Sequence, residues 1–410
     1  MSTIEPMLST GIAGQTTSTR IASIDIFRGL TMAVMIFVNA LSDVHGMPWW
    51  TEHAPGNVDV MTYVDMVFPF FLFVLGVSMP IAVTQRLKRN PSQPQLWAHV
   101  LVRSVSLIVL GYILANVEKA DAGRMLLSGG TWGFLALLCA SLYINVYPAS
   151  ERYRTLFKVI KYAGLTGLVV LLALFRRSTH GQGTWLDPSY PEILGLIGFS
   201  YFATSILYIP TRRSHRASIL WLTILMAFCS LTTARVFSFP GRLPLYVWPF
   251  GNGAMPAIIM AGVVTSSIFL GAASATRVLR AILIGTGFGL VLIVAGFLLA
   301  PLGISKIRAT PTWCLYSSGT AALLFTGLYW LCDVRKKTAW ANFVRPAGSN
   351  TLLTYLLPDL WYFFFLAFNI TYLDTHLNAG LPGFLKTLVF TSLMLSLAWL
   401  LTRARIRLQL

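Results

Sequence analysis

Residues 66–83 read MVFPFFLFVLGVSMPIAV, a stretch without a charged side chain, and Arg86, Lys88 and Arg89 follow it directly. An α-helix needs about 20 predominantly apolar residues to cross roughly 30 Å of hydrocarbon. An apolar run that ends in a basic cluster is typical of a transmembrane helix whose basic end faces the cytoplasm. The stretch therefore predicts a protein embedded in a membrane.

Similar runs recur along the 410-residue chain, which is 56% hydrophobic and only 11% charged. Soluble domains carry about 25% charged residues. We predict helices near 23–41, 62–85, 96–116, 130–147, 156–175, 190–209, 217–237, 254–274, 277–300, 311–332, 347–370 and 381–402. The fold expected is an all-α, polytopic membrane protein with about twelve transmembrane helices (10–12). The polar residues 1–19 lack the pattern of a signal peptide, and we expect a disordered tail there.

The basic residues indicate how the chain is oriented. Twenty Lys and Arg residues fall in one alternate set of loops and eight in the other. Cytoplasmic loops carry the excess of positive charge, so we expect both termini in the cytoplasm. The net charge of +17 follows from these short clusters. Because no long basic stripe with interleaved aromatic residues occurs, we expect no nucleic-acid partner.

The loop 42–61 has no Lys or Arg and faces outward in this topology. It carries His53, and Asp65 lies twelve residues further on at the start of the next apolar run. A histidine beside an oriented carboxylate is the usual general base, which makes both residues catalytic candidates. The alternatives are an ordinary exposed histidine and a carboxylate stabilised by the helix dipole.

Polar residues in or beside apolar runs are the other candidates. Charged groups cost roughly 3 kcal/mol or more at the centre of a membrane helix, so they suggest function. Asp25 and Arg28 are three residues apart and share a helix face, where they bind a ligand or form an interfacial ion pair. Asn39 orients a ligand carbonyl or a histidine, or bonds to backbone. Lys306 and Arg308 form an outer cationic pair, suited to an acidic sugar or to lipid phosphates.

Several of these residues occur together in a known pattern. The segments 23–31 (SIDIFRGLT) and 65–76 (DMVFPFFLFVLG), with Asn39 and His53-Ala54-Pro55 between them, resemble the heparan-α-glucosaminide N-acetyltransferase family of transmembrane acyltransferases. Looser similarity follows at 191–198, 306–311 and 348–352. The resemblance implies an enzyme that takes the acetyl group of cytosolic acetyl-CoA and transfers it to an amino sugar across the membrane.

The resemblance also implies residue roles. His53 matches the catalytic histidine of the family, Asp65 its aspartate and Asn39 its asparagine. We expect catalysis by His53 and Asp65, and binding of substrate or acetyl-CoA by Asn39, Asp25, Arg28, Lys306, Arg308 and Asn350. The four cysteines form no CxxC pair or Cys/His cluster, so we expect no metal.

The chain also departs from the family pattern. Residues 124–175 resemble an extra helix pair, and we expect a chain without the large luminal domain of the animal enzymes. We therefore expect a bacterial-type member in the cytoplasmic (inner) membrane, with one transmembrane acyltransferase domain over residues 20–410. Its expected partners are acetyl-CoA, a glycan or amino-sugar acceptor and the lipid bilayer, with a homodimer left open. The alternatives are an O-acyltransferase of envelope polysaccharide and a transporter or flippase of a lipid-linked sugar.

Overall fold

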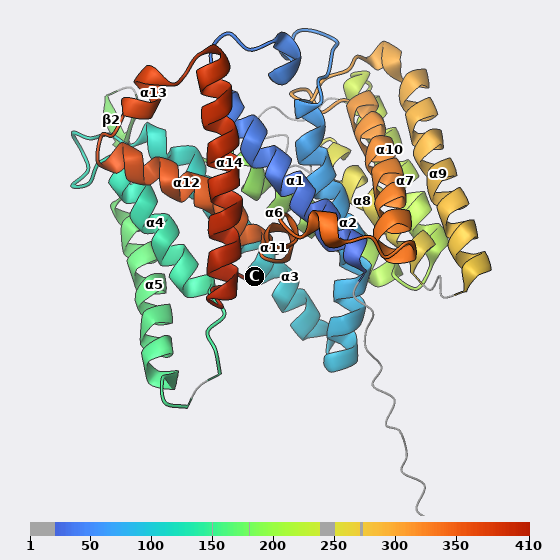
Figure 1. Ribbon diagram of the computed structural model, residues 1–410, viewed down its shortest axis with the longest axis horizontal. Coiled ribbons are helices and arrows are strands. Elements are labelled where there is room, and N and C mark those ends of the chain that lie inside the picture. Colours follow the sequence, from blue (N-terminus) through green and yellow to red (C-terminus); the bar gives the residue numbers. More distant parts are fainter. Residues whose placement is uncertain (1–20, 150, 180, 238–250, 271–273) are drawn as a thin grey trace, which may run out of the picture.

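The computed structural model (Figure 1) describes residues 21–149, 151–179, 181–237, 251–270 and 274–410. The predicted disordered tail, residues 1–19, lies outside the described residues. The α-helices are α1 Ala22–Leu41, α2 Val64–Arg89, α3 Gln93–Asn116, α4 Gly129–Ile144, α5 Arg154–Leu174, α6 Glu192–Thr211, α7 His215–Thr233, α8 Ala254–Phe269, α9 Ala275–Leu298, α10 Pro311–Leu328, α11 Arg345–Ser349, α12 Thr351–Ala367, α13 Tyr372–His376 and α14 Gly380–Arg403.

Short elements join these helices. They are the 3-10 turns η1 Trp49–Thr51, η2 Val117–Lys119, η3 Ala300–Leu302 and η5 Ala339–Ala341, the π-helical turn η4 Tyr329–Val334, and the strands β1 Arg177–Thr179 and β2 Gln182–Thr184. The strands pair antiparallel, with Arg177 opposite Thr184. The sequence patterns did not predict this small hairpin.

Within the described residues, eight helices are long and apolar enough to cross a membrane: α1, α2, α3 (continued to Lys119), α5, α6, α7, α9 and α14. The shorter helices α4, α8 and α12 are also apolar. The prediction of an all-α, polytopic membrane protein is confirmed at this level. Each of the twelve predicted segments contains a helix, while the number of crossings stays a prediction.

One predicted segment, 347–370, is divided. Its backbone leaves the helix at Asn350, where φ is −128° and ψ is 55°, so α11 and α12 are separate helices. The Asn350 amide donates to the carbonyl of Ile406 (2.8 Å) and accepts from the backbone of Leu408 (3.2 Å). Contacts with the C-terminal segment therefore accompany a break that apolar periodicity alone does not reveal.

Glycines allow the central helices α2 and α8 to approach closely. A Cβ atom on Gly76 would lie 1.9 Å from the carbonyl oxygen of Ile259, and one on Gly262 would lie 2.0 Å from that of Phe73. Small residues permit such backbone contact between membrane helices. The same holds for α1 and α11, where a Cβ atom on Gly348 would lie 1.9 Å from the Asp25 carbonyl oxygen.

The loops gather at two ends of the bundle. The upper end in Figure 1 contains the loop after α1 and the connection from α9 to α10. Its segments 42–63, 303–310 and 369–379 are tied together, for example by the backbone bond from His45 to Asn378 (2.9 Å). The opposite, lower end contains the α4–α5 loop and residues 404–410, joined by the bond from Val146 to Arg407 (2.9 Å).

Candidate active site

The loop 42–63 presents His53 at the upper end. Pro48 precedes the 3-10 turn η1, and the Thr51 hydroxyl donates to its carbonyl at 2.7 Å. Further along, the Thr62 hydroxyl donates to the carbonyl of Glu52 at 2.8 Å. These two bonds close the loop on either side of His53. The His53 side chain is 41% exposed, so it is held in place and still open to a substrate.

Asp65 lies in the first turn of α2 with its side chain 1% exposed. Its Oδ1 lies 2.8 Å from Nδ1 of His53. Its Oδ2 accepts from the backbone N–H groups of Thr62 (3.0 Å) and Ala54 (3.3 Å). The indole N–H of Trp313, on α10, donates to the backbone carbonyl of Asp65 at 3.0 Å. The Thr62 hydroxyl also lies 3.5 Å from Oδ2, so this buried carboxylate is held by several donors with Oδ1 directed at His53.

This arrangement selects a form of the His53 ring. Because a carboxylate only accepts hydrogen bonds, the 2.8 Å contact assigns the Nδ1 proton to the bond with Asp65. The lone pair of a neutral imidazole then resides on Nε2. Nε2 is therefore the atom of this pair that can accept a proton from a nucleophile.

Lys306 approaches the same ring from the α9–α10 connection. Its Nζ lies 3.3 Å from Nδ1 and 3.2 Å from Nε2 of His53. Burial lowers the pKa of the Lys306 ammonium below its ordinary value of 10.5, while the charges of Asp65 and Glu192 act in the opposite direction. Asp65 and Lys306 thus flank the candidate base, and the charge of Glu192 acts on Lys306.

The connection that carries Lys306 is firmly held. Arg308 forms an ion pair and a hydrogen bond with Asp59, and the backbone N–H of Ile304 donates to the same carboxylate at 3.2 Å. These bonds hold the pKa of Asp59 below its ordinary value, the Arg308 bond having the larger effect. The Thr310 hydroxyl accepts from the backbone of Ser305 at 3.0 Å. The loop after α1 is therefore latched to the loop before α10.

The predicted outer cationic pair is divided by these contacts. Lys306 contacts the His53 ring, whereas Arg308 forms an ion pair with Asp59. Asn39 also belongs to the upper end, near the end of α1, and it is exposed. Among the described residues, no hydrogen bond joins the Asn39 amide to His53 or Asp65.

The remaining predicted residues lie at the other end of the bundle. Asp25 and Arg28 approach to 3.8 Å in the first turns of α1. Arg28 donates to the Ser78 hydroxyl at 2.6 Å and to the Gly348 carbonyl at 3.1 Å. Ser78 is thirteen residues after Asp65 on α2, or roughly 20 Å along the helix. Asn350 is buried there and holds the C-terminal segment.

Sequence reasoning did not assign site roles to Glu192, Thr62 and Trp313. Glu192 begins α6 and is near enough to Lys306 to influence its charge. Of these three residues, Thr62 could have been recognised from the sequence. It lies three residues before Asp65, and a hydroxyl residue at that spacing is common at helix starts. Trp313 is 248 residues from Asp65, and only the packing of α10 against α2 brings them together.

The described residues contain no group of three or more His, Cys, Asp or Glu side chains that could hold a metal ion. The groups that the structure brings together at the upper end are a candidate base, a carboxylate that orients it and a cation. These groups suit proton abstraction from a nucleophile and stabilisation of a developing negative charge.

Comparison with known proteins adds a family and two relatives. The family described as "Domain of unknown function (DUF5009)" matches residues 20–239, more than half of the chain. Human heparan-alpha-glucosaminide N-acetyltransferase is 37% identical over 183 residues, covering 42% of this chain and 26% of the enzyme. The mouse enzyme is 34% identical over 102 residues, covering 25% of this chain and 15% of the enzyme. The similarity thus spans about a quarter or less of each relative's length.

Proposed function

The chain belongs to the DUF5009 family, and from its partial similarity to two N-acetyltransferases and its upper-end geometry we propose that it is a transmembrane acetyltransferase. It takes the acetyl group of cytosolic acetyl-CoA and transfers it to an amino sugar or another glycan acceptor on the exoplasmic side. The contact between His53 and the buried Asp65, 2.8 Å long, is the observation that carries this proposal.

The proposed reaction uses Nε2 of His53 as general base. As the acceptor amine attacks the thioester carbonyl, a C–N bond forms and Nε2 takes the amine proton. The C–S bond then breaks, and the proton passes from His53 to the departing CoA thiolate. Asp65 keeps the Nδ1 proton in place and stabilises the imidazolium that forms between these two steps.

Lys306 has two roles in this proposal: it occupies the base in the resting structure, and it stabilises the intermediate during the reaction. In the resting structure its Nζ lies 3.2 Å from Nε2, close to the lone pair that must accept the proton. The acceptor must therefore displace Lys306 when it binds. The displaced ammonium remains close enough to stabilise the oxyanion of the tetrahedral intermediate, a role that fixed donors fill in other acyl transfers.

The proposed topology has twelve crossings with both termini in the cytoplasm. The twelve crossings are α1 to α10, α12 and α14, which run alternately between the two ends, and basic loop residues gather at the lower end, as expected for a cytoplasmic face. The upper end is then exoplasmic. Residues 20–410 form one acyltransferase domain of a bacterial cytoplasmic membrane, and α4 and α5 are its added helix pair.

The other predicted residues have separate places in this proposal. Asp25, Arg28 and Asn350 border the cytoplasmic side, where acetyl-CoA enters, and Asn39 borders the acceptor on the outer side. Arg28 has its guanidinium on Ser78 and Gly348 in the resting structure. Donor binding there would require exchange of at least one of these bonds.

Sidedness provides the test. Purified protein is reconstituted into sealed vesicles with glucosamine trapped inside and radiolabelled acetyl-CoA added outside. N-acetylglucosamine should accumulate inside, and vesicles without protein should form none. Product that forms only when both reactants share one compartment would contradict transfer across the membrane. Release of the trapped glucosamine from the vesicles without acetyl-CoA would instead identify a transporter.

A further inference from the structure

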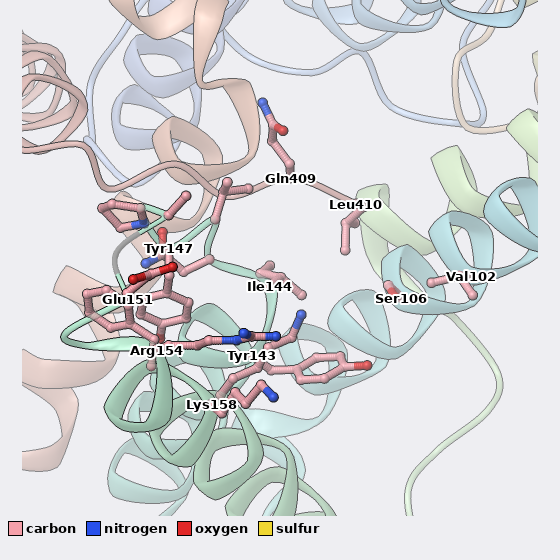
Figure 2. Close-up of a pocket in the computed structure, with 16 residues that line it drawn as sticks. Val102, Ser106, Tyr143, Ile144, Tyr147, Glu151, Arg154, Lys158, Gln409 and Leu410 are labelled. Carbon is pink, nitrogen blue, oxygen red and sulfur yellow. The ribbon is translucent and has the colours of Figure 1, made fainter. Parts of the chain in front are cut away.

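A cavity at the lower end lies far from His53, between α3, the end of α4, the start of α5 and the C-terminal segment (Figure 2). Its volume is about 690 Å³. Figure 2 shows Arg154 and Lys158 extending from α5 toward Tyr143, with Val102 and Ser106 on the neighbouring α3. Nothing in the proposed reaction at the upper end uses this cavity.

Three cations line one side of the cavity. Arg154, Lys158 and Lys161 are spaced by four and three residues, so they share one face of α5. Among the described residues, no ion pair involves any of the three. Glu151 is the acidic side chain that also lines the cavity. The Nζ atom of Lys161 lies 5.4 Å from the centre of the Tyr143 ring.

The remaining walls are apolar and well fixed. The rings of Tyr147 and Phe157 stack with centroids 5.1 Å apart and an interplanar angle of 24°. The Tyr147 hydroxyl donates to the Leu142 carbonyl at 2.8 Å. Gln409 and Leu410 of the C-terminal segment also line the cavity, and the backbone N–H of Arg407 ties this segment to the Asn145 side chain (3.0 Å). These contacts fix the described residues of the α4–α5 side and of the C-terminal segment that line the cavity.

Three like charges on one helix face repel one another, which destabilises the helix when no anion compensates them. A phosphate group supplies the missing negative charge and several strong acceptors for Arg and Lys. The apolar and aromatic walls suit an apolar part of the ligand attached to that phosphate. Basic pockets between membrane helices on the cytoplasmic side are typical sites of phosphate-bearing ligands.

We propose that this cavity binds the phosphate of an amphiphilic ligand through Arg154, Lys158 and Lys161. Two sources share this chemistry: the nucleotide end of a CoA ester, and the headgroup of an anionic phospholipid entering from the bilayer. The inference does not rest on the proposed reaction, because binding at this cavity requires neither His53 nor turnover.

Binding of two probes tests the proposal. The soluble probe is adenosine 3′,5′-bisphosphate, titrated by calorimetry in detergent. The lipid probe is phosphatidylglycerol, whose retention in nanodiscs is followed by native mass spectrometry. The variant R154Q/K158Q/K161Q removes the three charges. The control R213Q/R216Q/R277Q removes the same charge from exposed positions that do not line the cavity.

Wild-type and control protein should bind at least one probe, and the cavity variant should bind that probe roughly tenfold more weakly or worse. A loss confined to the bisphosphate assigns the nucleotide, and a loss confined to phosphatidylglycerol assigns the lipid. Equal binding by the cavity variant and the control, or no binding by the wild type, would overturn the proposal. If the triple variant does not fold, Lys158→Glu against Arg216→Glu gives the same comparison.

Discussion

The Nζ atom of Lys306 lies 3.3 Å and 3.2 Å from the two ring nitrogens of His53, although 253 residues separate them along the chain. The contact joins the loop after α1 to the connection between α9 and α10. It places a cation beside Nε2 of His53, the atom proposed to take the proton from the attacking amine. The chemistry of the upper end therefore depends on two loops that meet only in the folded protein.

The charge of Lys306 should limit activity at alkaline pH. Burial lowers the pKa of this ammonium, so its charge is lost at a lower pH than that of an exposed lysine. Activity that needs the cation should then fall as pH rises toward 10. Arginine stays protonated throughout this range. Lys306→Arg should therefore lack the loss of activity that deprotonation of Lys306 causes. The ratio of variant kcat to wild-type kcat should then rise between pH 7 and pH 10. A constant ratio would contradict the role given to Lys306.

Asp65→Asn should reduce kcat by about 10² to 10⁴, the usual contribution of a general base. An amide at this position no longer favours the Nδ1 proton of His53 or stabilises the imidazolium. The backbone donors of Thr62 and Ala54 can still bond to its oxygen, so the fold should survive. Glu52→Gln, in the same loop and exposed, is the matched control. Equal kcat values for the two variants would exclude the proposed pair.

Breaking the Asp59–Arg308 latch should lower activity without abolishing it. Arg308→Gln and Asp59→Asn each release the connection that carries Lys306. Because both residues act through one contact, the double variant should have nearly the same kcat as the single variants. Additive losses would show that the two side chains act independently.

The latch should also persist in mild acid. The pKa of Asp59 is lowered in the fold, so its contribution is present above the unfolded pKa of about 3.9 and is lost only as pH falls through the lower folded value. The effect of Arg308→Gln on kcat should therefore be the same at pH 5 and pH 8. An effect that disappears at pH 5 would contradict this assignment.

Gly76→Ala should destabilise the bundle, because the new Cβ atom would lie 1.9 Å from the Ile259 carbonyl oxygen. Overpacking of this kind costs about 1–3 kcal/mol. Gly287→Ala on α9 is the control, since a Cβ atom there meets no atom within 4 Å. It should be neutral or slightly stabilising, as alanine favours helix by about 1 kcal/mol over glycine. Thermal unfolding in detergent compares the two, and an unchanged Tm for Gly76→Ala would show that the crossing can relax.

The helices could be predicted because each depends on a local run of apolar residues. The pairing of His53 with Asp65 could also be predicted, since both lie within one loop and the helix that follows it. The positions of Lys306 and Arg308 could not. Both were expected to act as one cationic pair, but the packing of α10 against α2 places Lys306 on His53 and Arg308 on Asp59.

The break at Asn350 escaped prediction for a similar physical reason. An asparagine in an apolar run carries no signal that its amide will meet the backbone of Ile406 and Leu408. These partners are more than fifty residues away along the chain. Interactions of this kind are specified by the assembled bundle rather than by the neighbouring sequence.

The central claim is that His53 transfers a proton during acetyl transfer, and His53→Gln tests it most directly. Purified wild-type and variant proteins are compared for acetyl-CoA binding by calorimetry and for CoA thiol release in the presence of glucosamine. Both proteins should bind acetyl-CoA with similar affinity, and only the wild type should release CoA and form N-acetylglucosamine. Release of CoA by His53→Gln at the wild-type rate, or absence of acetyl-CoA binding by the folded wild type, would contradict the claim.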